Sequence, residues 1–240
     1  MKYFVALLIL LGSIGANSQD KKLTISRLTG DLYVYTTSQV FGGTLFPANG
    51  MYLLTDHGAV MIDTPWDTTQ FQPLLDSIRV KHHKKVVMCI ATHFHEDRTA
   101  GLEFFRKQGV KTFTTKLTDD LSKKNNKKRA EYLINGDTTF RVGQYSVQTF
   151  YPGQGHSPDN IVIWFDKNRV LYGGCFIKST EASDIGNLSD ANTKAWPASI
   201  QAIQEKFPKI RYVIPGHQGW QDKKSLEHTL ELIKKSESKK

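Results

Sequence analysis

KVVMCIATHFHED, residues 85–97, runs from a nearly continuous apolar segment directly into a cluster of polar side chains. The apolar part, residues 85–92, is typical of a β-strand that is covered on both faces. Side chains two residues apart lie on the same side of extended backbone, so His93, His95 and Asp97 can converge on one point. Two imidazoles and a carboxylate suit a divalent transition metal, above all zinc. The segment therefore predicts a metal site at the end of a buried strand.

Three further turns repeat this order of a strand, a glycine and a strong metal ligand. The ligands are His156, Cys175 and His217, and they follow predicted strands at 145–151, 169–172 and 212–214. A single polar residue of this kind would be ordinary at the solvated end of a strand. Three recurrences favour a common site built on rigid elements.

The rest of the chain alternates short strands with amphipathic helices. Asp67, with Gln70 three residues later, predicts the start of a helix that continues through Ile78. Further strands are expected within 23–35, 50–63, 110–114, 138–142 and 160–165, and helices around 102–105 and at 198–207 and 226–235. The first two strand segments predict an antiparallel meander. Two β-rich halves, each ending in helices, predict two packed sheets with helices outside, in one domain.

The first residues are expected to be an export signal. A positive start precedes an apolar run at 4–14 that is too short for a membrane span, and Ala16-Asn17-Ser18 matches a signal-peptidase site. We therefore assign residues 1–18 to a signal peptide and 19–240 to the mature domain, located most simply in a bacterial periplasm. No cysteine follows the apolar run, so no lipid anchor is expected. A buried N-terminal helix is the alternative, but it would break abruptly at residues 19–22.

The amino-acid composition limits the class of protein and the kinds of binding partner. The 240 residues are 39% hydrophobic and 23% charged, which argues against a disordered chain, a collagen or a membrane bundle. The net charge of +9 arises partly from lysines in 123–128 and at the C-terminus, without the interleaved aromatics of a nucleic-acid reader. A solvated lysine surface is the simpler interpretation. We see no dimerisation element and expect a monomer. His57, His82, His83 and His228 are interpreted as surface residues.

The motifs H-x-H-x-D (93–97), G-H-S-P-D-N (155–160), G-G-C (173–175) and P-G-H (215–217) resemble, in this order, the metallo-β-lactamase superfamily, and more narrowly its subclass B1. H-x-H-x-D alone is shared by many hydrolases, whereas the full set covers almost the whole mature chain. The resemblance implies an α+β fold, a four-layer αββα sandwich of two similar halves with the metal site between the sheets. It implies two zinc ions, one held by His93, His95 and His156, the other by Asp97, Cys175 and His217.

Three positions distinguish the chain within this superfamily. Arg98 stands where other hydrolases such as glyoxalase II carry a second-site histidine, and Cys175 replaces that ligand with a soft thiolate. His93 stands where the predominantly mono-zinc lactamase subclass has asparagine, so two occupied sites are expected. Ala100 replaces a glycine of many relatives and is expected to adjust only its loop. The resemblance makes Asp63, Arg98 and Asp159 supports of the ligands.

The implied activity is that of a secreted zinc-dependent β-lactamase, a hydrolase of cyclic amides. Zinc-bound hydroxide would open penicillins, cephalosporins and carbapenems, and so confer antibiotic resistance. Asp97 would orient the nucleophile, and Asn187 would hydrogen-bond the lactam carbonyl. Lys178 would hold the substrate carboxylate. The resemblance makes the glycine-rich tip of residues 41–46, which carries Phe41 and Phe46, a mobile flap over the substrate, with Trp66 on the opposite wall.

Several alternatives remain open at this stage. Phe46 and Trp66 also fit a plain core, Lys178 a surface lysine and Asn187 a loop. Cys175 could pair with Cys89, which otherwise reads as a small buried hydrophobe. The same fold could hydrolyse another ester, thioester or lactone, or only bind zinc. The combination of Arg98, Cys175 and Lys178 argues against a hydrolase of other substrates. Six intact ligands argue against a protein that only binds zinc.

Overall fold

The structure is a computed structural model that describes residues 22–135 and 137–238. Its strands form two sheets. The larger sheet holds, in spatial order, β1 (Leu23–Thr29), β2 (Leu32–Phe41), β3 (Thr44–Thr55), β4 (Gly58–Ile62), β5 (Val86–Ile90), β6 (Lys111–Thr115) and β7 (Tyr132–Ile134). The smaller sheet holds β12 (Tyr212–Pro215), β11 (Val170–Gly174), β10 (Val162–Phe165), β9 (Tyr145–Phe150) and β8 (Thr139–Val142). The predicted meander is confirmed, because β1 to β4 pair antiparallel in sequence order.

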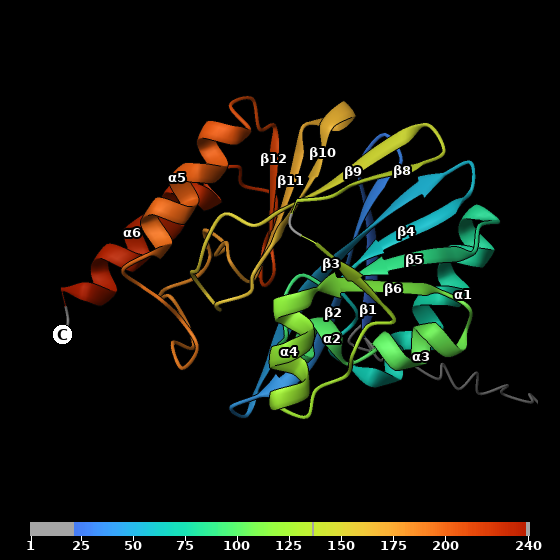
Figure 1. Cartoon of the computed structure of the whole chain (residues 1–240), viewed down its shortest axis with the longest axis horizontal. Helices are drawn as coiled ribbons and strands as arrows, with labels where there is room; N and C mark the ends of the chain where they lie inside the picture. Colours follow the sequence, from blue (N-terminus) through green and yellow to red (C-terminus); the bar gives the residue numbers. More distant parts are fainter. Residues whose placement is uncertain (1–21, 136, 239–240) are drawn as a thin grey trace, which may run out of the picture.

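Helices cover the outer faces of both sheets (Figure 1). The larger sheet carries α1 (Phe71–His82), α3 (Leu102–Lys107) and α4 (Lys116–Lys124), and α2 (Glu96–Thr99) is a single short turn after β5. On the smaller sheet lie α5 (Trp196–Lys206) and α6 (Ser225–Glu237). Two 3₁₀ turns complete the described elements, η1 (Thr68–Gln70) and η2 (Asp166–Asn168).

The alternation of side chains along β2 shows why the layers form. Leu32 and Val34 point into the core between the two sheets, whereas Tyr33 and Tyr35 point into the core under α1 and α3. A strand with apolar residues on both faces can be buried only between two layers. A third core joins α5 and α6 to the smaller sheet. The four-layer αββα sandwich is therefore confirmed, with halves of seven and five strands.

Two predictions at helix starts need correction. Asp67 caps η1, because its carboxylate accepts from the Thr69 amide at 2.9 Å, and α1 begins only at Phe71. His95 is the residue before α2, so Asp97 lies in the first helical turn and not on extended backbone. The predicted alignment of Asp97 with the two histidines along one side of extended backbone is therefore wrong.

Besides the single turn α2, the sequence analysis missed two elements, α4 and β7. The buried face of α4 is formed by Thr118, Asp119 and Ser122, so the helix has no apolar periodicity that could reveal it. The edge strand β7 has only three residues, and Tyr132 and Leu133 in it are exposed. Both elements hold their places through tertiary contacts instead of a local pattern.

The N-terminal export signal, assigned to residues 1–18, lies outside the described residues. Among residues 22–135 and 137–238, no helix has both the length and the apolar character that crossing a membrane would require.

Candidate metal centre

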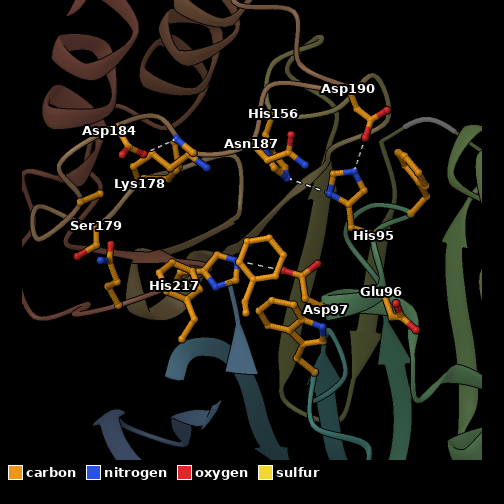
Figure 2. A pocket seen from close by; sticks show the side chains of 18 of the residues that line it. His95, Glu96, Asp97, His156, Lys178, Ser179, Asp184, Asn187, Asp190 and His217 are labelled. Atoms are coloured by element: carbon orange, nitrogen blue, oxygen red, sulfur yellow. Dashed lines mark hydrogen bonds and ion pairs between the residues drawn. The ribbon is translucent and has the colours of Figure 1, made fainter. Parts of the chain in front are cut away.

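Polar side chains from separate loops point toward one another around a common pocket (Figure 2). Each loop follows a strand, namely β5, β9, β11 or β12. The structure brings together all six predicted metal ligands, which are His93, His95, Asp97, His156, Cys175 and His217. The arrangement resolves into two adjacent groups of donors.

The first group consists of three histidines. The ligand atoms of His93, His95 and His156 lie within 4.8 Å of one another, and His95 Nδ1 is 3.1 Å from His156 Nε2. Burial lowers the pKa of His93 and of His156 well below the ordinary value, so both rings are neutral and carry free lone pairs. His93 Nε2 is buried without a hydrogen-bond partner among the described residues. A buried orphan nitrogen is costly, and a metal ion would satisfy it.

The second group combines a carboxylate, a thiol and an imidazole. Asp97 Oδ2 is 3.0 Å from His217 Nε2 and 3.2 Å from Cys175 Sγ, and these last two atoms are 3.2 Å apart. Burial raises the pKa of the Cys175 thiol, a shift that a coordinated cation would reverse. Both Cys175 and Cys89 are free, so the alternative disulfide does not form.

Neighbouring acceptors fix the tautomers of two of these histidines. His217 Nδ1 lies 2.9 Å from the Pro47 carbonyl, and His95 Nε2 lies 3.0 Å from an Asp190 carboxylate oxygen. Carbonyl and carboxylate oxygens only accept, so those ring nitrogens carry the protons. The opposite nitrogens, which face the cluster, are thereby left as lone-pair donors to a metal.

Arg98 connects the second group to the frame behind it. Its side chain is 1% exposed, and its guanidinium donates to Asp97 Oδ2 at 3.0 Å, to the Gly216 carbonyl at 2.9 Å and to the Asn49 carbonyl at 2.6 Å. These bonds tie Asp97 to the turn that carries His217 and to β3. The structure therefore places Arg98 against the ligands without making it a ligand.

Asp63 supports the end of β5 from the protein interior. Its carboxylate accepts from the Thr92 amide at 2.7 Å and from the Tyr172 hydroxyl at 2.7 Å. Burial raises the pKa of Asp63 to about 6, although Arg98 and these hydrogen bonds oppose the shift. Because Thr92 immediately precedes His93, Asp63 fixes the point from which the first ligand leaves the sheet.

Asp159 holds the next stretch of the same loop. Its Oδ2 accepts from the Phe94 amide at 2.8 Å, between the two histidines of the motif. Burial raises its pKa. Asp159 thus links the His156 loop to the His93–His95 segment.

Two residues around the centre were missed by the sequence analysis. Asn49 donates from Nδ2 to the carbonyls of Pro215 and Gln218, and so grips the turn around His217. A polar residue in the middle of an apolar strand was the available signal for Asn49. Asp190, the partner of His95, lies in a polar loop that offers no comparable signal.

A cavity of about 750 Å³ opens beside the metal centre, between the β2–β3 hairpin and the loops after β11. Phe41 and Trp66 line it with their rings 5.7 Å apart, and the Phe46 ring is 5.0 Å from that of His217. The partly exposed Phe46 and Trp66 therefore face the cavity, which argues against the alternative that both are plain core residues. The hairpin turns at Gly42-Gly43, whose φ angles of 57° and 79° are natural for glycine.

The opposite wall carries the two predicted polar contacts. Lys178 lines the cavity with Nζ 5.5 Å from the Trp196 ring centroid, and burial lowers its pKa. Asn187 also lines the cavity, but its Oδ1 accepts from the Ser189 amide at 2.9 Å. Asn187 therefore does stabilise its own loop through Oδ1, whereas its amide nitrogen has no hydrogen-bond partner within residues 22–135 and 137–238.

Comparisons with known proteins agree with this architecture. The profile of the Metallo-beta-lactamase superfamily matches residues 43–217. A metallo-beta-lactamase type 2 from Elizabethkingia meningoseptica is 44% identical over 98% of this chain and 95% of that protein. Metallo-beta-lactamase IND-1 from Chryseobacterium indologenes is 39% identical over 98% of each chain. The crystal structure of metallo-beta-lactamase IND-7 superposes with a TM-score of 0.86 at 40% identity, covering 90% of this chain and all of that one.

Replacing Arg98 with alanine should strongly destabilise the fold. The change leaves Asp63 and Asp97 buried without their cation, so we expect the free energy of unfolding to fall by about 3–5 kcal/mol. Urea unfolding in the presence of a chelator measures this. The control is Arg79→Ala, because Arg79 pairs with Asp76 at 3.0 Å on an exposed helix face and should cost less than about 1 kcal/mol. Equal losses for the two variants would contradict the role given to Arg98.

Proposed function

The chain belongs to the metallo-β-lactamase superfamily, and on that premise we propose that it is a zinc-dependent β-lactamase that opens the amide bond of β-lactam antibiotics. The observation that carries the proposal is the convergence of six metal-ligand side chains beside a cavity with a cation on its wall. The relatives named above are metallo-beta-lactamases, and this chain matches nearly their whole length.

The donor set suits zinc. One group offers three imidazoles, and the other offers a carboxylate, a thiol and an imidazole, which are the nitrogen, sulfur and oxygen donors that zinc prefers. We assign one zinc ion to His93, His95 and His156 and a second to Asp97, Cys175 and His217. Such ions lower the pKa of water toward about 7 and polarise a bound carbonyl.

Asp97 is placed to do more than bind metal. Burial by itself would raise the pKa of Asp97, but Arg98 and His217 beside it hold that pKa well below its ordinary value. The carboxylate therefore stays ionised and can accept a hydrogen bond from an attacking water. We assign to it the orientation of the nucleophile toward the lactam carbonyl.

The cavity walls supply binding and orientation. We propose that Lys178 holds the carboxylate that penicillins, cephalosporins and carbapenems share, because its ammonium lines the cavity beside the metal centre. The amide group of Asn187 would donate to the lactam carbonyl. Phe41, Phe46 and Trp66 would cover the apolar part of the substrate and exclude water from the reacting bond.

The biological setting follows from the sequence pattern. We propose that residues 1–18 direct export and that the mature chain acts as a periplasmic monomer. Hydrolysis there, before an antibiotic meets its target, would confer resistance, carbapenems included.

Turnover of a carbapenem and a penicillin by purified protein tests the proposed activity directly. We expect the lactam absorbance to fall in the presence of zinc. A chelator should stop this hydrolysis, and added zinc should restore it. The assay follows ultraviolet absorbance. No zinc-dependent turnover of any β-lactam would reject the proposal.

Cys175→Ser should separate the two metal sites. The hydroxyl is a poorer zinc ligand than a thiolate, so bound zinc should fall from about two equivalents toward one, with a sharp loss of kcat. Elemental analysis of dialysed protein measures the metal. Cys89→Ala is the control, since Cys89 lies in the core under α1 and its loss should leave both metals in place. Retention of two equivalents in Cys175→Ser would overturn the ligand assignment.

Lys178→Ala should weaken substrate binding more than the chemical step. Losing a charge-assisted contact to a carboxylate predicts a KM about tenfold higher or more, with a smaller change in kcat. Steady-state kinetics on one penicillin suffice. Lys194→Ala serves as the matched change at an exposed lysine, and a KM that is unchanged in Lys178→Ala would remove that residue from the binding site.

A further inference from the structure

A second lysine lines the cavity, on a different element from Lys178. Lys127 follows α4, and it borders the cavity together with Asn125 and Glu96. Figure 2 places Glu96 on the far side of the ligand cluster from Lys178. Lys127 Nζ is 3.3 Å from Glu96 Oε2. The two cations therefore reach the cavity from opposite sides of the metal centre.

The backbone that carries Lys127 is held in place. The Lys127 amide donates to the Ser122 carbonyl at 2.8 Å, after Asn126 turns the chain with φ of 53°. Arg129 clamps the same segment onto α4 through two bonds to the Asp119 carboxylate, at 2.8 and 2.7 Å. A bidentate pair of this kind fixes geometry as well as charge. The position of Lys127 is thus defined by its neighbours, although its side chain is long.

The other cations of this segment are directed elsewhere. Lys128 pairs with Glu103 at 3.1 Å and does not line the cavity, and Arg129 is engaged by Asp119. Of the basic residues at 123–129, Lys127 is the one that borders the cavity. A general lysine surface does not explain this selection.

The ion pair that holds Lys127 is weak and exchangeable. The Lys127 side chain is 33% exposed and that of Glu96 is 63% exposed, and pairs this exposed add little stability. Glu96, the more solvated partner, can return to water when Lys127 leaves it. Both residues line the cavity, so a bound anion can replace Glu96 as the partner of the Lys127 ammonium.

We propose that Lys127 is a specificity-determining residue that favours β-lactams with a second anionic group, a carboxylate or sulfonate on the acylamino substituent. The inference rests on the proposed function, since it assumes that Lys178 holds the carboxylate of the bicyclic nucleus. In penicillins the acylamino group lies across the lactam ring from that carboxylate. A substrate anchored at Lys178, with its lactam at the metal centre, directs this group toward Lys127.

Three penicillins that differ in one group test the proposal. Benzylpenicillin carries hydrogen at the side-chain α-carbon, carbenicillin a carboxylate and ampicillin an ammonium. We expect Lys127→Met to lower kcat/KM for carbenicillin relative to benzylpenicillin by about two- to fivefold, the range of an exposed charge pair. Lys127→Glu should lower this carbenicillin-to-benzylpenicillin ratio of kcat/KM further, and should raise the ratio of kcat/KM for ampicillin to that for benzylpenicillin. Added salt should shrink the preference of the unsubstituted enzyme for carbenicillin.

Lys128→Met is the matched control, because it removes the same charge one residue away, outside the cavity. This variant should leave kcat/KM for carbenicillin and for ampicillin, each relative to benzylpenicillin, unchanged. Bound zinc should be the same in all variants. If Lys127→Met keeps the unsubstituted carbenicillin ratio, or if Lys128→Met shifts it equally, the inference is wrong. If the unsubstituted enzyme hydrolyses none of the three penicillins, the proposed function fails instead, and this inference with it.

Discussion

One buried guanidinium holds the metal centre to the fold. Arg98 donates to the Asp97 carboxylate and to backbone carbonyls of β3 and of the turn after β12, so its partners include backbone from both sheets. Burying such a charge is costly unless every donor is satisfied, so the geometry around Arg98 tolerates little displacement. The constraint that stabilises this cation is also the constraint that sets the spacing of Asp97 and His217.

The side chain of Tyr172 belongs both to the apolar core and to the polar centre. Tyr172 places its ring in the core between the sheets, and its hydroxyl donates to Asp63 and contacts Arg98 and the Asn49 carbonyl. Burial raises its pKa well above the ordinary value, so it remains a neutral donor. Packing of the two sheets therefore positions the polar network directly, since one residue belongs to both.

The sequence predicted which six side chains converge better than it predicted their surroundings. Each ligand follows a strand end, often with glycine beside it, and strand ends are visible in one dimension as the close of an apolar run. Asp190 carries no such mark, because its partner His95 is distant in sequence. The predicted extended backbone at Asp97 was wrong, because the helix α2 has only four residues and is too short to show helical periodicity in the sequence. Tertiary contacts that join distant loops, such as those of Asn49, become visible only in three dimensions.

The β2–β3 hairpin joins an exposed tip to a root that is fixed by hydrogen bonds. Phe46 faces the cavity, yet the next residue, Pro47, accepts from His217, and Asn49 clamps the following turn. Any hinge for opening this hairpin must therefore lie on the tip side of Pro47, since bending beyond it would displace His217. Mutations at the exposed tip, around Phe41, can reshape the mouth of the cavity while the root keeps the ligands still. Such a division would let substitutions at the tip change which molecules fit the cavity without displacing the polar groups at its base.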